Sequence, residues 1–355
     1  MYNIGHVHFD ITQACNLNCK YCFYYENDSI KTTDQDLSFD IIKRVINEIE
    51  ELGTDTLNYT FSGGEVFLRD DFYDILDLVR HRKIKILTNG LLIKNSDILK
   101  LSYYDNIEEI RISFDGFNGN KKNRLINDSD YLWERIKTIS DTKGIPISIN
   151  TIITRHNYNE LIDIYNSLKT LDSFYQWKID MPFFRGRYTK THDELYVSNE
   201  KIVSEIKKLL EIYKKDNMPF RIEVKNLFKP ELINGKIIKF DANEHPCNYN
   251  IGSITIRGNG DVGFCPSLPL NFGNIKEQSI KEITQNTKFN DFINLKVSQI
   301  SEKCLDCKYL ELCGAGCRAD SYLLTKSLNE IDRISCDILP YIETDILPIF
   351  MKGSV

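Results

Sequence analysis

Short runs of β-branched and aromatic residues alternate with longer amphipathic stretches from residue 6 to about residue 215. This alternation predicts repeated βα units around a parallel sheet. Six of the runs are short and bounded by turn residues, as buried strands are; they occupy residues 6–12, 56–61, 84–88, 109–114, 146–153 and 176–180. Six consecutive units are too few for a closed eightfold barrel. The pattern therefore fits an α/β fold, built either as an open partial barrel or as a doubly wound sheet.

Helices are expected between the strands, and the first is the clearest. Ser38 can cap its N-terminus, and Gly53 can close its C-terminus. One face carries the apolar residues Ile41, Ile42, Val45, Ile46 and Ile49. Residues 128–142, 157–171 and 198–215 have the same amphipathic pattern.

The composition changes after about residue 240, where Gly, Asn, Pro and Cys become frequent. We therefore expect a βα domain with a bridging segment over residues 1–235 and a small Cys-rich domain with a C-terminal helix over residues 236–355. Within the second part, residues 253–257 and 261–265 flank the sequence Gly258-Asn259-Gly260. This arrangement predicts a β-hairpin with a tight turn.

The overall composition is that of an ordinary soluble globular protein, with 42% hydrophobic residues, 27% charged residues and a net charge of −6. It excludes disordered, collagen-like and coiled-coil proteins. The acidic balance and the absence of a Lys/Arg run argue against a nucleic-acid partner. No stretch approaches the ~20 apolar residues of a membrane span, and the N-terminus lacks the features of a signal peptide. We therefore expect a cytoplasmic protein without a membrane partner.

Ten cysteines stand out from this background, because thiols in a reducing compartment more often bind metals than form disulfides. The first three, Cys15, Cys19 and Cys22, form a C-x3-C-x2-C pattern directly after the first predicted strand. Three thiolates on one loop can hold three corners of a 4Fe-4S cluster and leave the fourth iron open. The alternative, a structural zinc site, would need a fourth ligand from a distant part of the chain.

At these residues the sequence resembles the radical SAM superfamily, whose members bind S-adenosylmethionine (SAM) at the open iron of such a cluster. The resemblance implies that residues 6 to about 215 form the partial (β/α)6 barrel of that superfamily, with the cluster loop at the C-terminal mouth of the barrel. The resemblance implies that Tyr21, the aromatic residue before the last cysteine, lies near the adenine. It also assigns the Gly63-Gly64-Glu65 sequence, after the second strand, to the methionine amino group. Glycines permit close backbone approach, and a carboxylate can hold an ammonium by a charge-assisted hydrogen bond.

The resemblance extends to the ends of the next three strands, where polar residues match positions that line the cofactor site. Asn-Gly and Asp-Gly pairs are also ordinary turn sequences, so a purely structural role stays open here. An arginine in this region can equally be a surface charge. The candidates are Thr88 and Asn89, Ser113 and Asp115, and, more weakly, Asn150 and Arg155.

The other seven cysteines resemble the SPASM extension of radical SAM enzymes that modify peptides and proteins. The resemblance implies a distal auxiliary 4Fe-4S cluster on Cys304, Cys307, Cys313 and Cys336, and a proximal one on Cys247, Cys265 and Cys317. With the SAM-binding cluster, three 4Fe-4S clusters are expected. A zinc ribbon, the alternative, would use only four of these cysteines.

Seven thiolates cannot ligate all eight irons of two four-iron clusters. One proximal iron is therefore expected to be open, or to be held by water, a substrate thiolate or a side chain such as His245. We favour an open site slightly. His6 and His8 alternate along the first strand and can face the barrel interior, where neutral, hydrogen-bonded histidines are common.

The implied activity is reductive cleavage of SAM to a 5′-deoxyadenosyl radical, which abstracts a substrate hydrogen. Among relatives of this architecture, anaerobic sulfatase-maturing enzymes have Asp directly after the second extension cysteine, where this chain has Pro266, and typically Gln at the position of Ser62. We therefore favour an oxidoreductase that matures ribosomal peptides by thioether or carbon-carbon crosslinks. A further departure, Val66 in place of the family's frequent Pro, affects turn rigidity more than chemistry. The sequence names no catalytic base.

Several alternatives stay open: sulfatase-maturase-like oxidation, peptide epimerisation, radical chemistry on a small metabolite, and a non-enzymatic iron-sulfur electron carrier. The Gly63-Gly64-Glu65 sequence and the incomplete first cluster speak against the carrier. The expected partners are a peptide or protein substrate and a reductant such as flavodoxin or ferredoxin. Because the cluster loop begins at Cys15, leader recognition would need a separate protein or the extension itself, unless there is no leader.

Overall fold

The computed structural model describes the chain except residues 1, 143, 230, 232–241, 248–251 and 352–355. All six predicted strands are present, and most begin a residue or two earlier than expected. They are β1 (Ile4–Thr12), β2 (Gly53–Gly63), β3 (Lys83–Thr88), β4 (Ile107–Ser113), β5 (Ile147–Ile152) and β6 (Phe174–Asp180).

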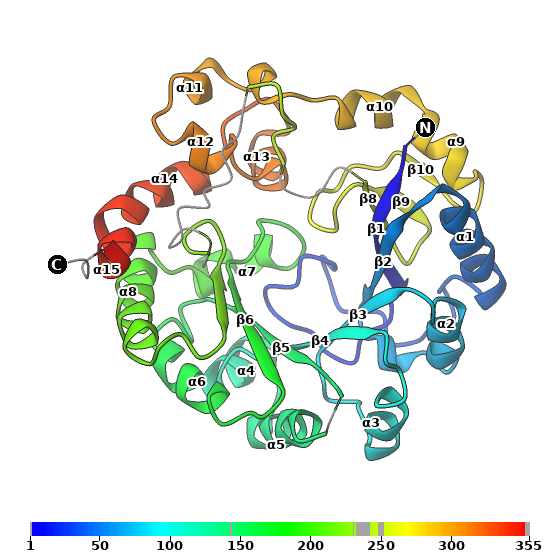
Figure 1. Ribbon diagram of the computed structural model, residues 1–355, viewed down its shortest axis with the longest axis horizontal. Coiled ribbons are helices and arrows are strands. Elements are labelled where there is room, and N and C mark those ends of the chain that lie inside the picture. Colours follow the sequence, from blue (N-terminus) through cyan, green and yellow to red (C-terminus); the bar gives the residue numbers. More distant parts are fainter. Residues whose placement is uncertain (1, 143, 230, 232–241, 248–251, 352–355) are drawn as a thin grey trace.

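The strands form one open sheet in the order β10-β9-β8-β1-β2-β3-β4-β5-β6-β7. From β1 to β7 all neighbours are parallel, with Phe9 opposite Phe61 and Phe61 opposite Ile86. Helices lie in an arc outside the curved strands (Figure 1). The open partial barrel is thus the alternative that the structure confirms. The seventh parallel strand, β7 (Arg221–Val224), was not predicted because its four residues are too short for a recognisable period.

The helix α1 (Phe39–Leu52) begins as predicted, since the Ser38 side chain accepts a hydrogen bond from the backbone N–H of Ile41 at 3.4 Å. Its apolar face packs Ile42, Val45, Ile46 and Ile49 into the core. Gly53, however, is extended (φ −73°) and begins β2 rather than forming a left-handed cap. The other barrel helices are α2 (Phe72–Leu78), α3 (Asn95–Leu101), α4 (Phe117–Asn123), α5 (Ser129–Ser140), α6 (Leu161–Leu168), α7 (Tyr188–Leu195) and α8 (Asn199–Lys215).

The predicted hairpin is also present. Strands β8 (Ser253–Ile256) and β9 (Asp261–Gly263) are antiparallel around a turn in which Gly260 has φ +96°. β8 also pairs in parallel with β1, placing Ile254 opposite Val7. The expected boundary at residue 235 lies outside the described residues. The hairpin beyond it belongs to the barrel sheet, in which β8 is the neighbour of β1.

The remaining C-terminal elements cross from one side of the barrel to the other (Figure 1). α9 packs against α1, and the last helices pack against α8. Ion pairs hold these elements against the barrel helices, such as the pair of Lys207 with Asp345 at 3.1 Å. None of the helices that the structure describes is long and apolar enough to span a membrane. The elements are β10 (Gly273–Asn274), α9 (Ile280–Gln285), α10 (Thr287–Ile293), α11 (Glu302–Leu305), α12 (Leu310–Cys313), α13 (Arg318–Thr325), α14 (Arg333–Tyr341), a π-helical turn (Ile342–Ile346) and α15 (Leu347–Met351).

Candidate functional site

The loop after β1, which carries the first cysteines, packs directly on the two glycines that end β2. The Gly64 N–H donates to the Thr12 carbonyl at 3.1 Å, and the Glu65 N–H donates to the Ala14 carbonyl at 2.8 Å. A Cβ on Gly64 would lie 2.0 Å from the Ala14 oxygen, and Gly63 has φ +137°. Both positions therefore require glycine, and the close approach that the sequence suggested is made by the cysteine loop itself.

The Glu65 side chain is buried and joins the ends of two strands. Its carboxylate accepts hydrogen bonds from the Thr88 hydroxyl at 2.6 Å and from the Asn89 N–H at 2.7 Å. It also accepts from the Phe67 N–H at 3.3 Å. Burial raises the pKa of Glu65, and these donors oppose the rise. The carboxylate expected to hold a methionine ammonium thus already has protein donors.

Asn89 connects the end of β3 to the cysteine loop. Its side-chain amide donates to the Asn16 side-chain oxygen at 2.8 Å, and its own oxygen accepts from the Leu91 N–H at 3.0 Å. Thr88, besides binding Glu65, accepts from the Gly90 N–H at 3.0 Å. Both residues therefore fix the cysteine loop against the sheet, which is a positioning role.

The three cysteines of this loop lie within electrostatic range of one another. Burial raises the pKa of the Cys19 thiol to about 12, and Cys22 and Cys15 act in the same direction. The Arg124 guanidinium opposes this rise and also acts on Cys15. Three gathered thiols beside a buried cation suit a negatively charged cluster bound through three thiolates. The residues present therefore fit the expected SAM-binding cluster.

Arg124 belongs to a buried group that faces the same loop. Tyr21 donates to the Asp115 carboxylate at 2.6 Å, and Arg124 contacts the Tyr21 hydroxyl at 3.3 Å. Asp115 is fully buried and also accepts from the Ile152 N–H at 2.9 Å. Tyr21 and Asp115 were expected here, whereas Arg124 was missed. No motif marks Arg124, because its place depends on how the short helix α4 lies against the loop.

The three remaining candidates lie in two different places. Ser113 and Asn150 are paired in register on β4 and β5, at the strand ends that lead to Asp115. Arg155 lies at the surface, where its side chain donates to the Tyr196 carbonyl at 3.1 Å. The structure therefore does not place Arg155 with Glu65 and Asp115, because the chain after β5 turns outward toward the end of α7. Arg124 is the guanidinium that reaches this site.

The cysteines of the C-terminal part form two groups. Cys313 lies within electrostatic range of Cys336, Cys304 and Cys307, and Cys336 within range of Cys304 and Cys307. Separately, Cys265 interacts with Cys247, and Cys317 interacts with Cys265. This division matches the expected distal and proximal ligand sets. All ten cysteines have free thiols.

Across the described residues, no three Cys, His, Asp or Glu side chains converge closely enough to ligate a single metal ion. A cubane cluster spaces its protein ligands more widely, since each thiolate binds a different iron.

The surroundings of the proximal group include an ion pair that the sequence did not indicate, and His245, which it did. Lys225, next to the end of β7, pairs with Asp320 on α13 at 2.9 Å, and its charge acts on Cys317. His245 is buried between Phe264 and Phe292, and its Nε2 lies 3.0 Å from the Phe292 carbonyl. One ring nitrogen of His245 is therefore already committed to the backbone.

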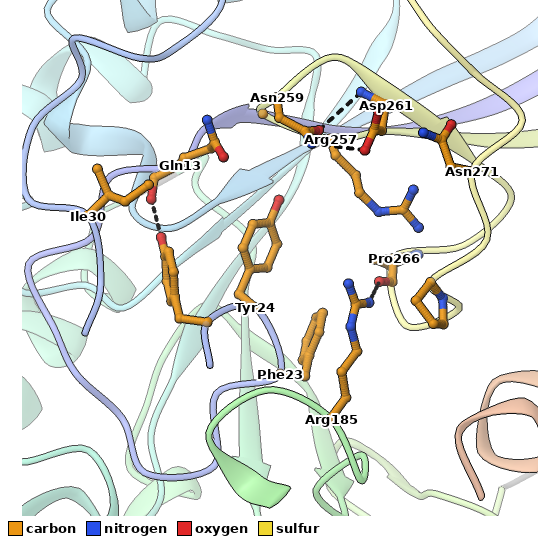
Figure 2. Close-up of a pocket in the computed structure, with 13 residues that line it drawn as sticks. Gln13, Phe23, Tyr24, Ile30, Arg185, Arg257, Asn259, Asp261, Pro266 and Asn271 are labelled. Carbon is orange, nitrogen blue, oxygen red and sulfur yellow. Dashed lines mark hydrogen bonds between the residues drawn. The ribbon is translucent and has the colours of Figure 1, made fainter. Parts of the chain in front are cut away.

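A cavity of about 230 Å³ lies between the first cysteine loop and the proximal loop. Phe23, Tyr24 and Tyr25, which follow Cys22, line one wall. The other wall contains Pro266, which follows Cys265 (Figure 2). A molecule bound here would lie beside both loops. The remaining lining residues are Gln13, Ile30, Arg185, Arg257, Gly258, Asn259, Asp261, Pro269 and Asn271.

Comparison with known proteins agrees with this geometry. Residues 9–168 match the family model of the radical SAM superfamily, and residues 247–308 match the SPASM iron-sulfur cluster-binding domain. An AdoMet-dependent heme synthase of Methanosarcina barkeri is 25% identical over 89% of this chain and 92% of its own. A cysteine-type anaerobic sulfatase-maturating enzyme of Clostridium perfringens is 27% identical over 86% of each chain.

Among solved structures, Streptococcus suis SuiB bound to its precursor peptide SuiA has the same fold, with a TM-score of 0.73 and 16% identity. The alignment covers 95% of this chain and 76% of SuiB. Both family models include cysteines grouped by the structure, the first model spanning Cys15–Cys22 and the second beginning at Cys247. The chain therefore contains a radical SAM domain over residues 9–168 and a SPASM domain over residues 247–308.

Proposed function

We propose that this protein is a radical SAM enzyme that matures a ribosomal peptide by forming a thioether or carbon-carbon crosslink. The observation that carries the proposal is the gathering of Cys15, Cys19 and Cys22 beside Gly63-Gly64, with a second cysteine group across the adjacent cavity. In this proposal a reductant such as flavodoxin or ferredoxin supplies the electron, and a separate protein can bind a leader.

The proposed cofactors are one SAM-binding and two auxiliary 4Fe-4S clusters. When bound, the first cluster with SAM would supply a 5′-deoxyadenosyl radical able to remove an unactivated hydrogen. Cys15, Cys19 and Cys22 would hold that cluster, and Arg124 would balance part of its negative charge. Tyr21 and Asp115 hold each other in a fixed orientation on the same side. Buried walls would exclude water and solvent hydrogen donors from the reacting carbon.

The peptide substrate is supported by the overall likeness to the Clostridium perfringens sulfatase-maturating enzyme and by the shared fold with SuiB, whose structure contains a precursor peptide. Pro266 directly follows Cys265, so this position offers no carboxylate as a base. This favours a crosslinking reaction over sulfatase-maturase-like oxidation.

A second candidate, radical chemistry on a small metabolite, is favoured by one specific observation. The Methanosarcina barkeri heme synthase matches along 92% of its own length, as completely as the peptide-modifying relatives do. The cavity between the two cysteine loops, at about 230 Å³, is also of a size that a small molecule could fill.

The test is 5′-deoxyadenosine formation by anaerobically reconstituted, dithionite-reduced protein given SAM. The wild type should form it, and Cys19→Ala should not. Cys336→Ser is the matched control, because Cys336 lies in the distal group and its loss should leave SAM cleavage measurable. A wild type that has a full iron complement and forms no 5′-deoxyadenosine, even with candidate substrates, would contradict the proposal and favour the electron carrier.

A further inference from the structure

The cavity between the cysteine loops contains two arginines that no sequence motif indicated, and both act electrostatically on Cys265. Arg185 lies on the segment between β6 and α7, and Arg257 follows β8. The two side chains extend toward Pro266 from opposite sides of the cavity (Figure 2). Each guanidinium is close enough to influence the other, and their mutual repulsion adds to burial in lowering the pKa of Arg185.

Arg185 uses few of its hydrogen-bond donors within the protein. One of its five N–H groups donates to the Pro266 carbonyl at 3.3 Å. Arg257 donates to two carbonyls, those of Leu268 at 2.6 Å and Leu270 at 3.2 Å, and so supports the cavity wall. Within the part of the chain that the structure describes, neither guanidinium forms an ion pair with Asp or Glu.

The acidic groups near the cavity do not neutralise this pair. Asp261 lines the cavity, but its carboxylate accepts from the side chains of Asn259 at 2.9 Å and Asn274 at 3.0 Å. Asp10 is buried, and its carboxylate contacts His8 at 3.0 Å. Its charge reaches Arg185, but the two do not form an ion pair. Two neighbouring cations that lack a bonded carboxylate are stabilised when an anion binds between them.

The rest of the lining indicates which anion. Phe23, Tyr24, Pro266 and Pro269 give the cavity apolar and aromatic walls. A small anion on an apolar stem fits such a space better than a polyphosphate does. In a peptide, groups of this kind are carboxylates, either an Asp or Glu side chain or the C-terminus.

We propose that Arg185 and Arg257 form a subsite for a substrate carboxylate, seated between the SAM-cluster loop and the proximal auxiliary loop. The inference rests on the proposed function only in assigning that carboxylate to a peptide. Arg185 lies two residues before Arg187, whose N–H binds the Cys22 carbonyl at 2.9 Å. A substrate carboxylate held by Arg185 and Arg257 determines which substrate carbon faces the SAM site, and the two arginines thereby influence specificity.

The test uses the reconstituted holoprotein and two fluorinated probes observed by 19F NMR, 4-fluorophenylacetate and its neutral amide. The carboxylate should bind to the wild type and the amide should not. Arg185→Gln should weaken carboxylate binding about tenfold or more, because charge-assisted hydrogen bonds are lost. Arg185→Glu should lose the carboxylate and gain 4-fluorobenzylamine. Arg80→Gln, which changes a half-exposed arginine two residues after α2, is the control and should behave as the wild type.

Iron content and the circular dichroism spectrum verify that each variant is folded and loaded. Equal binding of the two probes, or unchanged binding in folded Arg185→Gln, overturns the carboxylate subsite. Arg257→Gln is not used as the main variant, because Arg257 also supports the wall.

Competition experiments then distinguish the sources of the carboxylate. N-acetylated peptide amides with a single Glu, the same peptides with Gln, and neutral peptides with a free C-terminus compete with 4-fluorophenylacetate. If only the Glu-containing peptides displace the probe, the subsite binds a carboxylate side chain. If only the peptides with a free C-terminus displace it, the subsite binds the C-terminal carboxylate. If the probe binds through Arg185 but no peptide displaces it, the subsite stands and the peptide part of the proposed function fails.

Discussion

The Lys225 ammonium lies 2.9 Å from the Asp320 carboxylate, and this largely buried pair joins the end of the last barrel strand to α13. Lys225 also lies 3.5 Å from the centre of the Phe183 ring. Removing one partner of a buried ion pair leaves an uncompensated charge.

We therefore expect Lys225→Met to lower the free energy of unfolding by about 3–5 kcal/mol, and the double variant Lys225→Met/Asp320→Leu to recover most of that loss. Anaerobic chemical denaturation measures both. Lys207→Met is the matched control, since its pair with Asp345 is partly exposed and should contribute less than about 1 kcal/mol. Equal effects of the two single lysine variants would contradict this account.

Gly64→Ala should disrupt the SAM-cluster loop. The new methyl group would lie 2.0 Å from the Ala14 carbonyl oxygen, so the loop must move away from β2. We expect loss of iron and of SAM-cluster EPR signal after reconstitution. Gly5→Ala is the control, because its Cβ would only contact the Thr54 hydroxyl at 3.6 Å. Full SAM-cluster occupancy in Gly64→Ala would show that the contact is dispensable.

His6 should make stability depend on pH below neutrality. Burial, with help from the charges of His8 and Lys85, lowers the pKa of His6 to about 4, and its ring lies 3.0 Å from the Thr60 hydroxyl. The unfolded chain, with the usual value of about 6.5, binds the proton first. Stability is thus fully present above pH 6.5 and falls as the pH drops toward 4, by about 3 kcal/mol in total.

Urea denaturation of the wild type and of His6→Asn, at several pH values from 7 to 4.5, measures this contribution as the difference between the two proteins. The variant should lose less stability over the range. The control His81→Asn changes a histidine whose side chain is 59% exposed, and should follow the wild type. Parallel curves for all three proteins would remove His6 as the cause.

Arg124 and Arg155 should differ in their effect on SAM binding. Arg124 is 4% exposed and contacts Tyr21, whereas Arg155 lies at the surface against Tyr196. We expect Arg124→Gln to weaken SAM binding about tenfold or more, because a buried charge next to the cysteine loop is lost. Arg155→Gln should change it less than about twofold. Anaerobic equilibrium dialysis with labelled SAM measures both, and the reverse ranking would restore the assignment made from the sequence.

The two cysteine groups of the SPASM domain should lose iron independently. Cys313→Ser and Cys336→Ser should each remove about one four-iron cluster, and the double variant should remove no more than either alone. Cys265→Ser, from the other group, should be additive with Cys336→Ser. Iron analysis after reconstitution measures this, and additivity within the first group would contradict the grouping.

Much of the site was predictable because its chemistry lies in short contiguous segments. Two features can be read directly from the sequence: the spacing of Cys15, Cys19 and Cys22, and the position of Gly63-Gly64 after a strand. The strands were predictable because each is a run of buried apolar residues. Arg124 and Lys225 were not, since each acquires its role from a partner far away in the chain, Tyr21 and Asp320 respectively.

The place of Arg155 depends on a similar long-range contact. Its position after a strand end is correct for a site residue, but the direction of its side chain is set by the Tyr196 carbonyl. The role of Glu65 also needed the structure, because only there do the Thr88 and Asn89 donors appear beside it.

The pairing of β8 with β1 has a consequence for how the chain folds. β1, which leads into the cysteine loop, has β2 on one side and on the other a strand that begins at Ser253. Two strands so far apart in the sequence pair slowly. Until β8 pairs with β1, the edge of β1 has exposed backbone donors and acceptors. A fragment ending near residue 235 should therefore aggregate, and cluster insertion at Cys15 should await the arrival of the C-terminal hairpin.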